Sequence, residues 1–280
     1  MGLLKRVPRQ CVELAGRWAR PIRARHPSHR EPSALLWRTV TSGPLLDCEF
    51  LLPPAGESPL ADRIVAGTYE PELVEAIADL ARGGGYLYDV GAHVGVFECL
   101  WMAAGGAGVT AFEPLPYNAN LVRAVIARNQ LAHVNVLEVA VSDEDHSTTV
   151  IADESSISTS SMACLTSIRS AVERLDATRF KNARITDVTA RRLDTLCGEH
   201  RLPSPAVIKI DVEGAEAHVI RGALKTLQRT RPAIVSELHS VDAAVGVSVE
   251  LSRLGYEPSL LFHQKRTLSN YLWVSKRPSQ

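Results

Sequence analysis

Ionisable side chains stand at the ends of two apolar segments in the second half of the chain. Asp211 and Glu213 follow the run PAVIKI, and Glu237 and His239 close the run PAIVSELH. In each segment the polar residues are two positions apart, so extended backbone points their side chains to the same face. Carboxylates and imidazoles held together take up protons or bind a cation that acidifies a hydroxyl. We therefore take Asp211, Glu213 and His239 as candidate catalytic residues.

Two mechanisms fit this group. In the first, His239 or Asp211 is a general base. In the second, Asp211 and Glu237, joined by Glu213, hold Mg²⁺ or a similar hard cation. The sequence favours the first mechanism, because it places no further acid that would complete a cage around a cation.

Simpler roles are expected for the neighbouring charges. Glu216 stands where the next helix should begin, and a carboxylate there is stabilised by the helix dipole. The same explanation is an alternative to catalysis for Glu213. Lys209 is expected to pair with a nearby acid. Glu237 and His239 have a structural alternative as the capped or solvated end of a strand.

A glycine-rich bend follows the apolar run YLYDV in the first half of the chain. Asp89, Gly91, His93 and Gly95 alternate with apolar residues directly before a helical pattern. Glycine lets the backbone approach a ligand closely and adopt positive φ. The spacing is neither the GxGxxG of dinucleotide sites nor the GxxxxGK[ST] of phosphate-binding loops. The bend therefore predicts a ligand that has no pyrophosphate.

Two further strand ends complete a nucleoside site. The strand predicted in GVTAFEP ends on Glu113, and an acid at that position accepts hydrogen bonds from two ribose hydroxyls. The next strand ends in Ala140–Asp143, where an apolar rim with free backbone amides suits an adenine ring. S-adenosylmethionine (SAM) is a nucleoside without a pyrophosphate, and it is the expected cofactor. A divalent metal is expected only under the second mechanism.

Strand-like apolar runs alternate with helical runs along most of the chain. This alternation predicts a mostly parallel sheet with helices on both faces. Expected helices begin at Pro71 and span about 95–104, 117–129, 215–228 and 243–254. The last two strands have no helix between them, which allows an antiparallel hairpin at the edge of the sheet.

Five segments, in order along the chain, resemble the FkbM family of SAM-dependent methyltransferases. They are DVGAHVG, FEPLPYNAN, AVSD, KIDVEGAE and SELH, and KIDVEGAE is the most specific. The resemblance implies a class I, Rossmann-like fold with a seven-stranded sheet whose last strand is antiparallel. It also implies O-methylation of hydroxyls on sugars or polyketide-type natural products. His93 departs from the family, whose members usually carry Asn there.

The resemblance includes GTYEPEL, the segment before the first helix. It implies that Tyr69 and Glu70 close over the methionine part of SAM, with a surface helix start as the alternative. The expected acceptor is a hydroxylated small molecule, sugar or glycolipid. A binding module without catalysis is a second hypothesis, which the catalytic candidates disfavour. An NAD-dependent oxidoreductase is a third, which the glycine spacing disfavours.

The length of 280 residues suits one α/β domain with an extension. We expect a basic extension over 1–43 and a methyltransferase domain over 44–280, with an insertion at 144–205. The first 40 residues hold nine Lys or Arg and two acids, although the whole chain is balanced at 31 of each. The extension is expected to be partly disordered or to contact an anionic membrane. Nucleic acid is not expected, because no aromatic residues interleave with the basic ones.

The cysteines are five, scattered and without a CxxC pair. This excludes a disulfide framework or zinc site and favours a reducing cytoplasm, with peripheral membrane contact as an option. No apolar run approaches the roughly 20 residues that cross a bilayer. The Ser-rich run Ser155–Ser161 is expected to line the acceptor pocket or to form an unstructured loop. The sequence predicts no oligomeric state.

Overall fold

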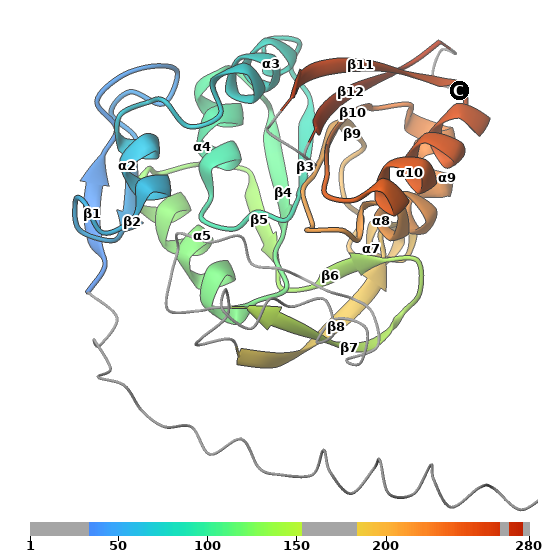
Figure 1. The fold of residues 1–280 in the computed structure, drawn as a ribbon, viewed down its shortest axis with the longest axis horizontal. Helices are drawn as coiled ribbons and strands as arrows, with labels where there is room; N and C mark the ends of the chain where they lie inside the picture. The colour runs from blue at the N-terminus through green and yellow to red at the C-terminus, as the bar shows by residue number, and fades with distance from the viewer. Residues whose placement is uncertain (1–33, 153–183, 264–268, 277–280) are drawn as a thin grey trace, which may run out of the picture. The chain divides into compact units, whose positions relative to one another are not determined.

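The computed structural model describes residues 34–152, 184–263 and 269–276 (Figure 1). The predictions for the basic extension before Ala34 and for Ser155–Ser161 lie outside the described residues. The compact unit begins at Ala34. This is earlier than the predicted domain boundary at residue 44, because β1 (Leu36–Thr39) pairs antiparallel with β2 (Glu49–Leu52). No helix among the described residues is long and apolar enough to cross a membrane.

Seven strands form the central sheet, with helices on both of its faces (Figure 1). The strand order is β11-β12-β10-β9-β3-β4-β5. Only β12 runs antiparallel to its neighbours in this sheet. This arrangement confirms the predicted class I methyltransferase fold. The strands are β3 (Tyr86–Val90), β4 (Gly108–Phe112), β5 (Val134–Leu137), β9 (Pro205–Ile210), β10 (Ala233–Leu238), β11 (Tyr256–His263) and β12 (Ser269–Ser275).

The helices that flank the site begin at residues suited to a helix start. A proline opens both α3 (Pro71–Ala81) and α5 (Pro116–Arg128), where its fixed φ fits the first turn. Gly95, with φ 87°, precedes α4 (Val96–Ala103). The helix expected over 215–228 is divided in two at Ala223, whose φ of −110° is not helical. The remaining helices are α2 (Pro59–Val65), α7 (Leu193–Glu199), α8 (Glu216–Gly222), α9 (Leu224–Thr230) and α10 (Val241–Arg253).

Residues of the central strands alternate between two apolar cores. In β3, Leu87 packs in the core that contains α3 and α4, and Tyr88 packs in the core that contains α8, α9 and α10. Val207 and Ile208 divide in the same way in β9. Burial on both faces explains why these strands are continuous apolar runs. It also fixes the strand ends relative to one another.

A second sheet has the order β6-β8-β7. Its strands are β6 (Ala140–Ser142), β7 (His146–Ala152) and β8 (Arg184–Arg192). The segment predicted as an insertion over 144–205 thus includes β7, β8 and α7.

The prediction that Ala140 ends the third strand of the main sheet is wrong. That strand, β5, ends at Leu137, and the chain then turns to pair Ala140 with Ala190 of β8. Ala140 is buried in an apolar cluster with Leu115 and Val150. The adenine rim predicted at Ala140 is therefore not a strand tip, although Leu115 and Val150 face the cleft described below.

The order of the strands reverses direction at β3. From β3 the chain adds β4 and β5 on one side and later crosses to β9 and β10 on the other. Ligands of doubly wound sheets bind beyond the carboxyl ends of the strands at such a reversal. The candidate site is therefore expected just after Val90 and Ile210.

Candidate active site

A cleft of about 530 Å³ lies beyond the carboxyl ends of β3, β4 and β9. A smaller cavity of about 310 Å³ shares three of its lining residues, Gly91, His93 and Asp211. Tyr69, Phe97 and Lys209 are among the residues that line the smaller cavity. The cleft itself is lined by Gly91, His93, Glu113, Pro114, Leu115, Asn118, Val150, Asp211, Val212 and Glu213.

Glu113 lies on the wall of the cleft and is tied to the surrounding backbone. Its Oε2 accepts a hydrogen bond from the backbone N–H of His93 at 2.9 Å, and its Oε1 accepts one from that of Leu115 at 3.0 Å. The Asn118 amide donates at 3.4 Å. Burial raises the pKa of Glu113 to about 7, against the lowering effect of these bonds. The carboxylate is held in one orientation, and Oε2 keeps a further lone pair for a ligand, whereas Oε1 already accepts two hydrogen bonds.

The bend after β3 is set by contact with the bend after β9. Gly91 has φ 92°, and a Cβ there would lie 1.9 Å from the backbone oxygen of Asp211. Glycine is therefore required at this position by the close approach of the Asp211 backbone, whether or not a ligand also approaches it. His93 has φ 54°, and burial lowers the pKa of its ring to about 4, so the ring is neutral at pH 7.

Asp89 does not line either cavity. It is fully buried, and its Oδ1 lies 3.1 Å from Nζ of Lys209, which in turn donates to the backbone oxygen of Gly91 at 2.9 Å. Burial alone would lower the pKa of Lys209, but the Asp89 and Asp211 carboxylates raise it above its usual range. The predicted cofactor contact of Asp89 is replaced by an ion pair that supports the bend. Lys209 has the predicted role of a partner to an acid.

Glu98 is a buried carboxyl group that the sequence reasoning missed. It stands in the first turn of α4 and is 0% exposed, and neither of its oxygens has a hydrogen-bond partner among the described residues. Burial and the Asp89 carboxylate raise the pKa of Glu98 well above its usual value. The folded chain therefore favours the protonated, neutral form of Glu98 more than the unfolded chain does. Nothing in the apolar pattern of VFECLWMA distinguishes it from an exposed helical glutamate.

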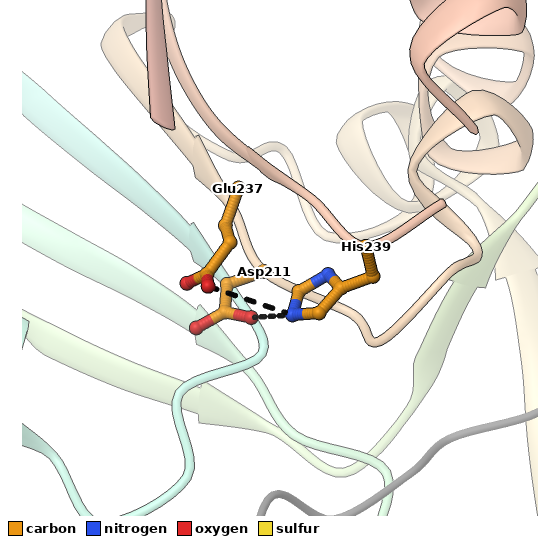
Figure 2. Close-up of side chains that lie close together, drawn as sticks. All are labelled: Asp211, Glu237 and His239. Carbon is orange, nitrogen blue, oxygen red and sulfur yellow. Dashed lines mark ion pairs between the residues drawn. The ribbon is translucent and has the colours of Figure 1, made fainter. Parts of the chain in front are cut away.

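The side chains of Asp211, Glu237 and His239 point toward one another (Figure 2). One ligand atom from each lies within 4.8 Å of the others. Nε2 of His239 is 3.6 Å from Oδ1 of Asp211 and 3.8 Å from Oε1 of Glu237. Glu213 adds a fourth group, with its Oε2 3.5 Å from the same nitrogen. The sequence prediction that these residues converge is met by the geometry.

Glu216 opens a helix as expected, but it also makes a contact that was not predicted. It begins α8 but is 0% exposed, and its Oε1 lies 2.6 Å from Nδ1 of His239. The same oxygen accepts a hydrogen bond from the backbone N–H of Gly214 at 2.9 Å. Glu216 therefore orients the imidazole. Its place at a helix start gave a sufficient explanation from sequence, so this contact was not predicted.

The protonation of His239 bears on which residue is the base. Burial lowers the pKa of His239, but the hydrogen bond to Glu216 and the charge of Asp211 raise it to about 10. With these neighbours the imidazole already carries both protons at pH 7 and is not a proton acceptor. Of the two predicted bases, this leaves Asp211.

Glu70 lies at the start of α3, near the acidic group. Its φ is 39°, and its buried Oε2 has no hydrogen-bond partner among the described residues. Burial and the charge of Asp211 raise the pKa of Glu70 to about 7. Glu70 is not among the residues that line the cavities, whereas its neighbour Tyr69 lines the smaller one. The structure therefore presents Tyr69, rather than Glu70, to a ligand.

Known proteins share this sequence pattern. The family described as Methyltransferase FkbM domain matches residues 89–262. The 31-O-demethyl-FK506 methyltransferase FkbM of Streptomyces tacrolimicus is 28% identical over 188 residues, which are 61% of this chain and 72% of that protein.

Two solved structures are also similar. Methyltransferase FkbM from Methylobacillus flagellatus KT is 16% identical with a TM-score of 0.48, and the match covers 68% of this chain and 43% of that one. A putative SAM-dependent methyltransferase from Streptococcus mutans is 10% identical with a TM-score of 0.48, over 89% of this chain and 57% of that one.

Proposed function

We propose that this chain, which belongs to the FkbM family of methyltransferases, transfers the methyl group of SAM to a hydroxyl oxygen. The observation that carries the proposal is the position of Glu113. Its carboxylate is fixed on the cleft wall, beyond the strand next to the glycine bend. An acid in that place is suited to bind the two hydroxyls of a ribose.

The shape of the cleft supports SAM as the cofactor. Leu115 and Val150 give it an apolar wall near Glu113, which suits a flat base. Asp211 lines both the cleft and the smaller cavity, so a ligand that fills both passes this carboxylate. A sulfonium is a cation, and a carboxylate beside it is favourable.

The acidic group supports a hydroxyl as the acceptor. An alcohol becomes an adequate nucleophile when it loses its proton as the new bond forms. Asp211 and Glu213 both line the cleft and are partly exposed, with 24% and 20% of their side chains accessible. One of these carboxylates takes the proton in this proposal. The 31-O-demethyl acceptor in the name of the Streptomyces tacrolimicus relative is consistent with an oxygen acceptor.

The acceptor class is a hydroxylated small molecule, sugar or glycolipid. Methyl-labelled SAM incubated with the full chain and pools of such acceptors tests it. The expected product carries label in a methyl ether, which survives mild alkali, whereas a methyl ester would be hydrolysed. Label that is released by alkali would exclude hydroxyl methylation, and no transfer from a chain that binds SAM would favour the binding-module hypothesis.

A further inference from the structure

We propose that Asp211, Glu237 and His239 bind one divalent cation. Asp211 follows β9, and Glu237 and His239 belong to the end of the adjacent parallel strand β10 and the residue after it. Their ligand atoms lie within 4.8 Å of one another. Donors 2.0–2.2 Å from a common ion stand up to about 4 Å apart, so small side-chain rotations close the site.

Glu237 gives an independent reason for a ligand here. It is 7% exposed, and the contact between its Oε1 and Nε2 of His239, at 3.8 Å, is longer than a hydrogen bond. Within the described part of the chain, its ion-pair neighbour is His239. A buried carboxylate without hydrogen bonds is costly unless it is paired or coordinates a metal. Glu237 points at the other two ligands (Figure 2), so a cation between them would satisfy it.

Glu216 completes an arrangement that is typical of metal-binding histidines. Such histidines have one ring nitrogen hydrogen-bonded to a carboxylate, which fixes the ring and leaves the other nitrogen for the metal. Nδ1 of His239 contacts the fully buried Glu216, and Nε2 faces Asp211 and Glu237. The cation would take the place of the Nε2 proton, which is released on binding. Glu216 is thus a positioning residue.

The ligand types indicate the class of cation. Two carboxylates favour a hard ion, and one imidazole extends the choice to first-row transition metals. Mn²⁺ satisfies both preferences. Mg²⁺ accepts nitrogen ligands less readily, because it prefers oxygen in an octahedral shell.

The role of the cation in catalysis rests on the proposed function. A bound cation with an open position holds the acceptor oxygen and lowers the pKa of its hydroxyl. With Asp211 occupied by the cation, Glu213 is the cleft carboxylate left to take the hydroxyl proton. The oxygen then forms the bond to the methyl carbon while the carbon–sulfur bond breaks, and S-adenosylhomocysteine leaves with the electron pair of that bond.

Titration of Mn²⁺ into the metal-stripped full chain tests the site without any activity measurement. The expected stoichiometry is one Mn²⁺ per chain. Glu237→Gln and His239→Gln should each weaken binding at least about tenfold, and Glu216→Gln about 10–100-fold. Glu98→Gln is the matched control, because it removes a buried carboxyl group outside the cluster and should leave Mn²⁺ affinity unchanged.

Pulsed EPR of the bound Mn²⁺ gives a second readout. The wild-type spectrum should show coupling to an imidazole nitrogen, and His239→Gln should lack it. The proposal would be overturned if the wild-type chain does not bind Mn²⁺ or if its spectrum shows no nitrogen coupling. It would also be overturned if the folded Glu237→Gln and His239→Gln variants bind Mn²⁺ as tightly as the wild type. Should a variant fail to fold, the wild-type spectrum still decides.

SAM titrated into the same metal-stripped chain separates this inference from the proposed function. If the chain binds Mn²⁺ but not SAM, the cation site is supported and its role in methyl transfer is excluded. SAM binding without Mn²⁺ binding keeps the cofactor assignment and removes the cation site.

Discussion

Asp89 and Lys209 form an ion pair of 3.1 Å in which both side chains are buried, one 0% and the other 3% exposed. The pair joins the ends of neighbouring strands β3 and β9. Because Lys209 also donates to the backbone oxygen of Gly91, the pair connects the two strands to the glycine bend. The arrangement of the backbone at the base of the cleft therefore depends on the buried ammonium group of Lys209.

Replacement of Lys209 by Met should destabilise the chain strongly. Removal of one partner leaves a buried charge without compensation, which costs about 3–5 kcal/mol. Thermal and urea unfolding measure the change. The double variant Asp89→Asn, Lys209→Met should recover part of the loss, and a double variant that loses as much as the sum of the two single changes would show that the pair is not coupled.

Gly91→Ala should be far more harmful than Gly105→Ala. Both glycines have positive φ, 92° and 104°, which costs alanine about 1–2 kcal/mol. Only at Gly91 does the new Cβ meet backbone, 1.9 Å from the oxygen of Asp211, whereas at Gly105 nothing lies within 4 Å. The difference in free energy of unfolding between the two variants measures the cost of the clash with the Asp211 backbone. Equal losses of stability would contradict the prediction that this clash is the larger cost.

Glu98→Gln should stabilise the chain increasingly as pH rises from 5 to 8. Burial and the Asp89 carboxylate raise the pKa of Glu98 in the folded chain, so the folded chain binds this proton more tightly than the unfolded chain does. That mismatch lowers the free energy of unfolding as pH rises through this range. Glutamine has the shape of the neutral acid and removes the mismatch. The difference in unfolding midpoint between variant and wild type, measured at each pH, should grow, and a constant or shrinking difference would refute a raised pKa of Glu98.

The sequence predicted the main sheet because its strands are apolar on both faces. Runs such as YLYDV and PAVIKI cannot be solvated on either side, so they belong in a covered parallel sheet. The bends after these strands were predicted for a similar reason, because glycine and acid residues concentrate there. Convergence of Asp211, Glu237 and His239 followed from the neighbouring positions of their strands.

Local patterns could not predict how buried acids pair across the fold. Glu98 and Glu216 both stand at helix starts, where an exposed carboxylate is also favourable. Their burial depends on tertiary packing that no spacing rule encodes. Ala140 was misplaced for a related reason, because the apolar run VNVLEVAVSD continues through a change of sheet after Leu137.

The most direct test of the account is calorimetric titration of SAM into the full chain, with Glu113→Gln and Glu138→Gln beside the wild type. Glu138 is an exposed carboxylate that pairs with Arg123 and serves as the control. We predict one SAM per chain, affinity at least about tenfold weaker for Glu113→Gln because charged hydrogen bonds are lost, and no change for Glu138→Gln. A folded wild-type chain that binds neither SAM nor S-adenosylhomocysteine, or a Glu113→Gln variant that binds SAM as tightly as the wild type, would contradict the account.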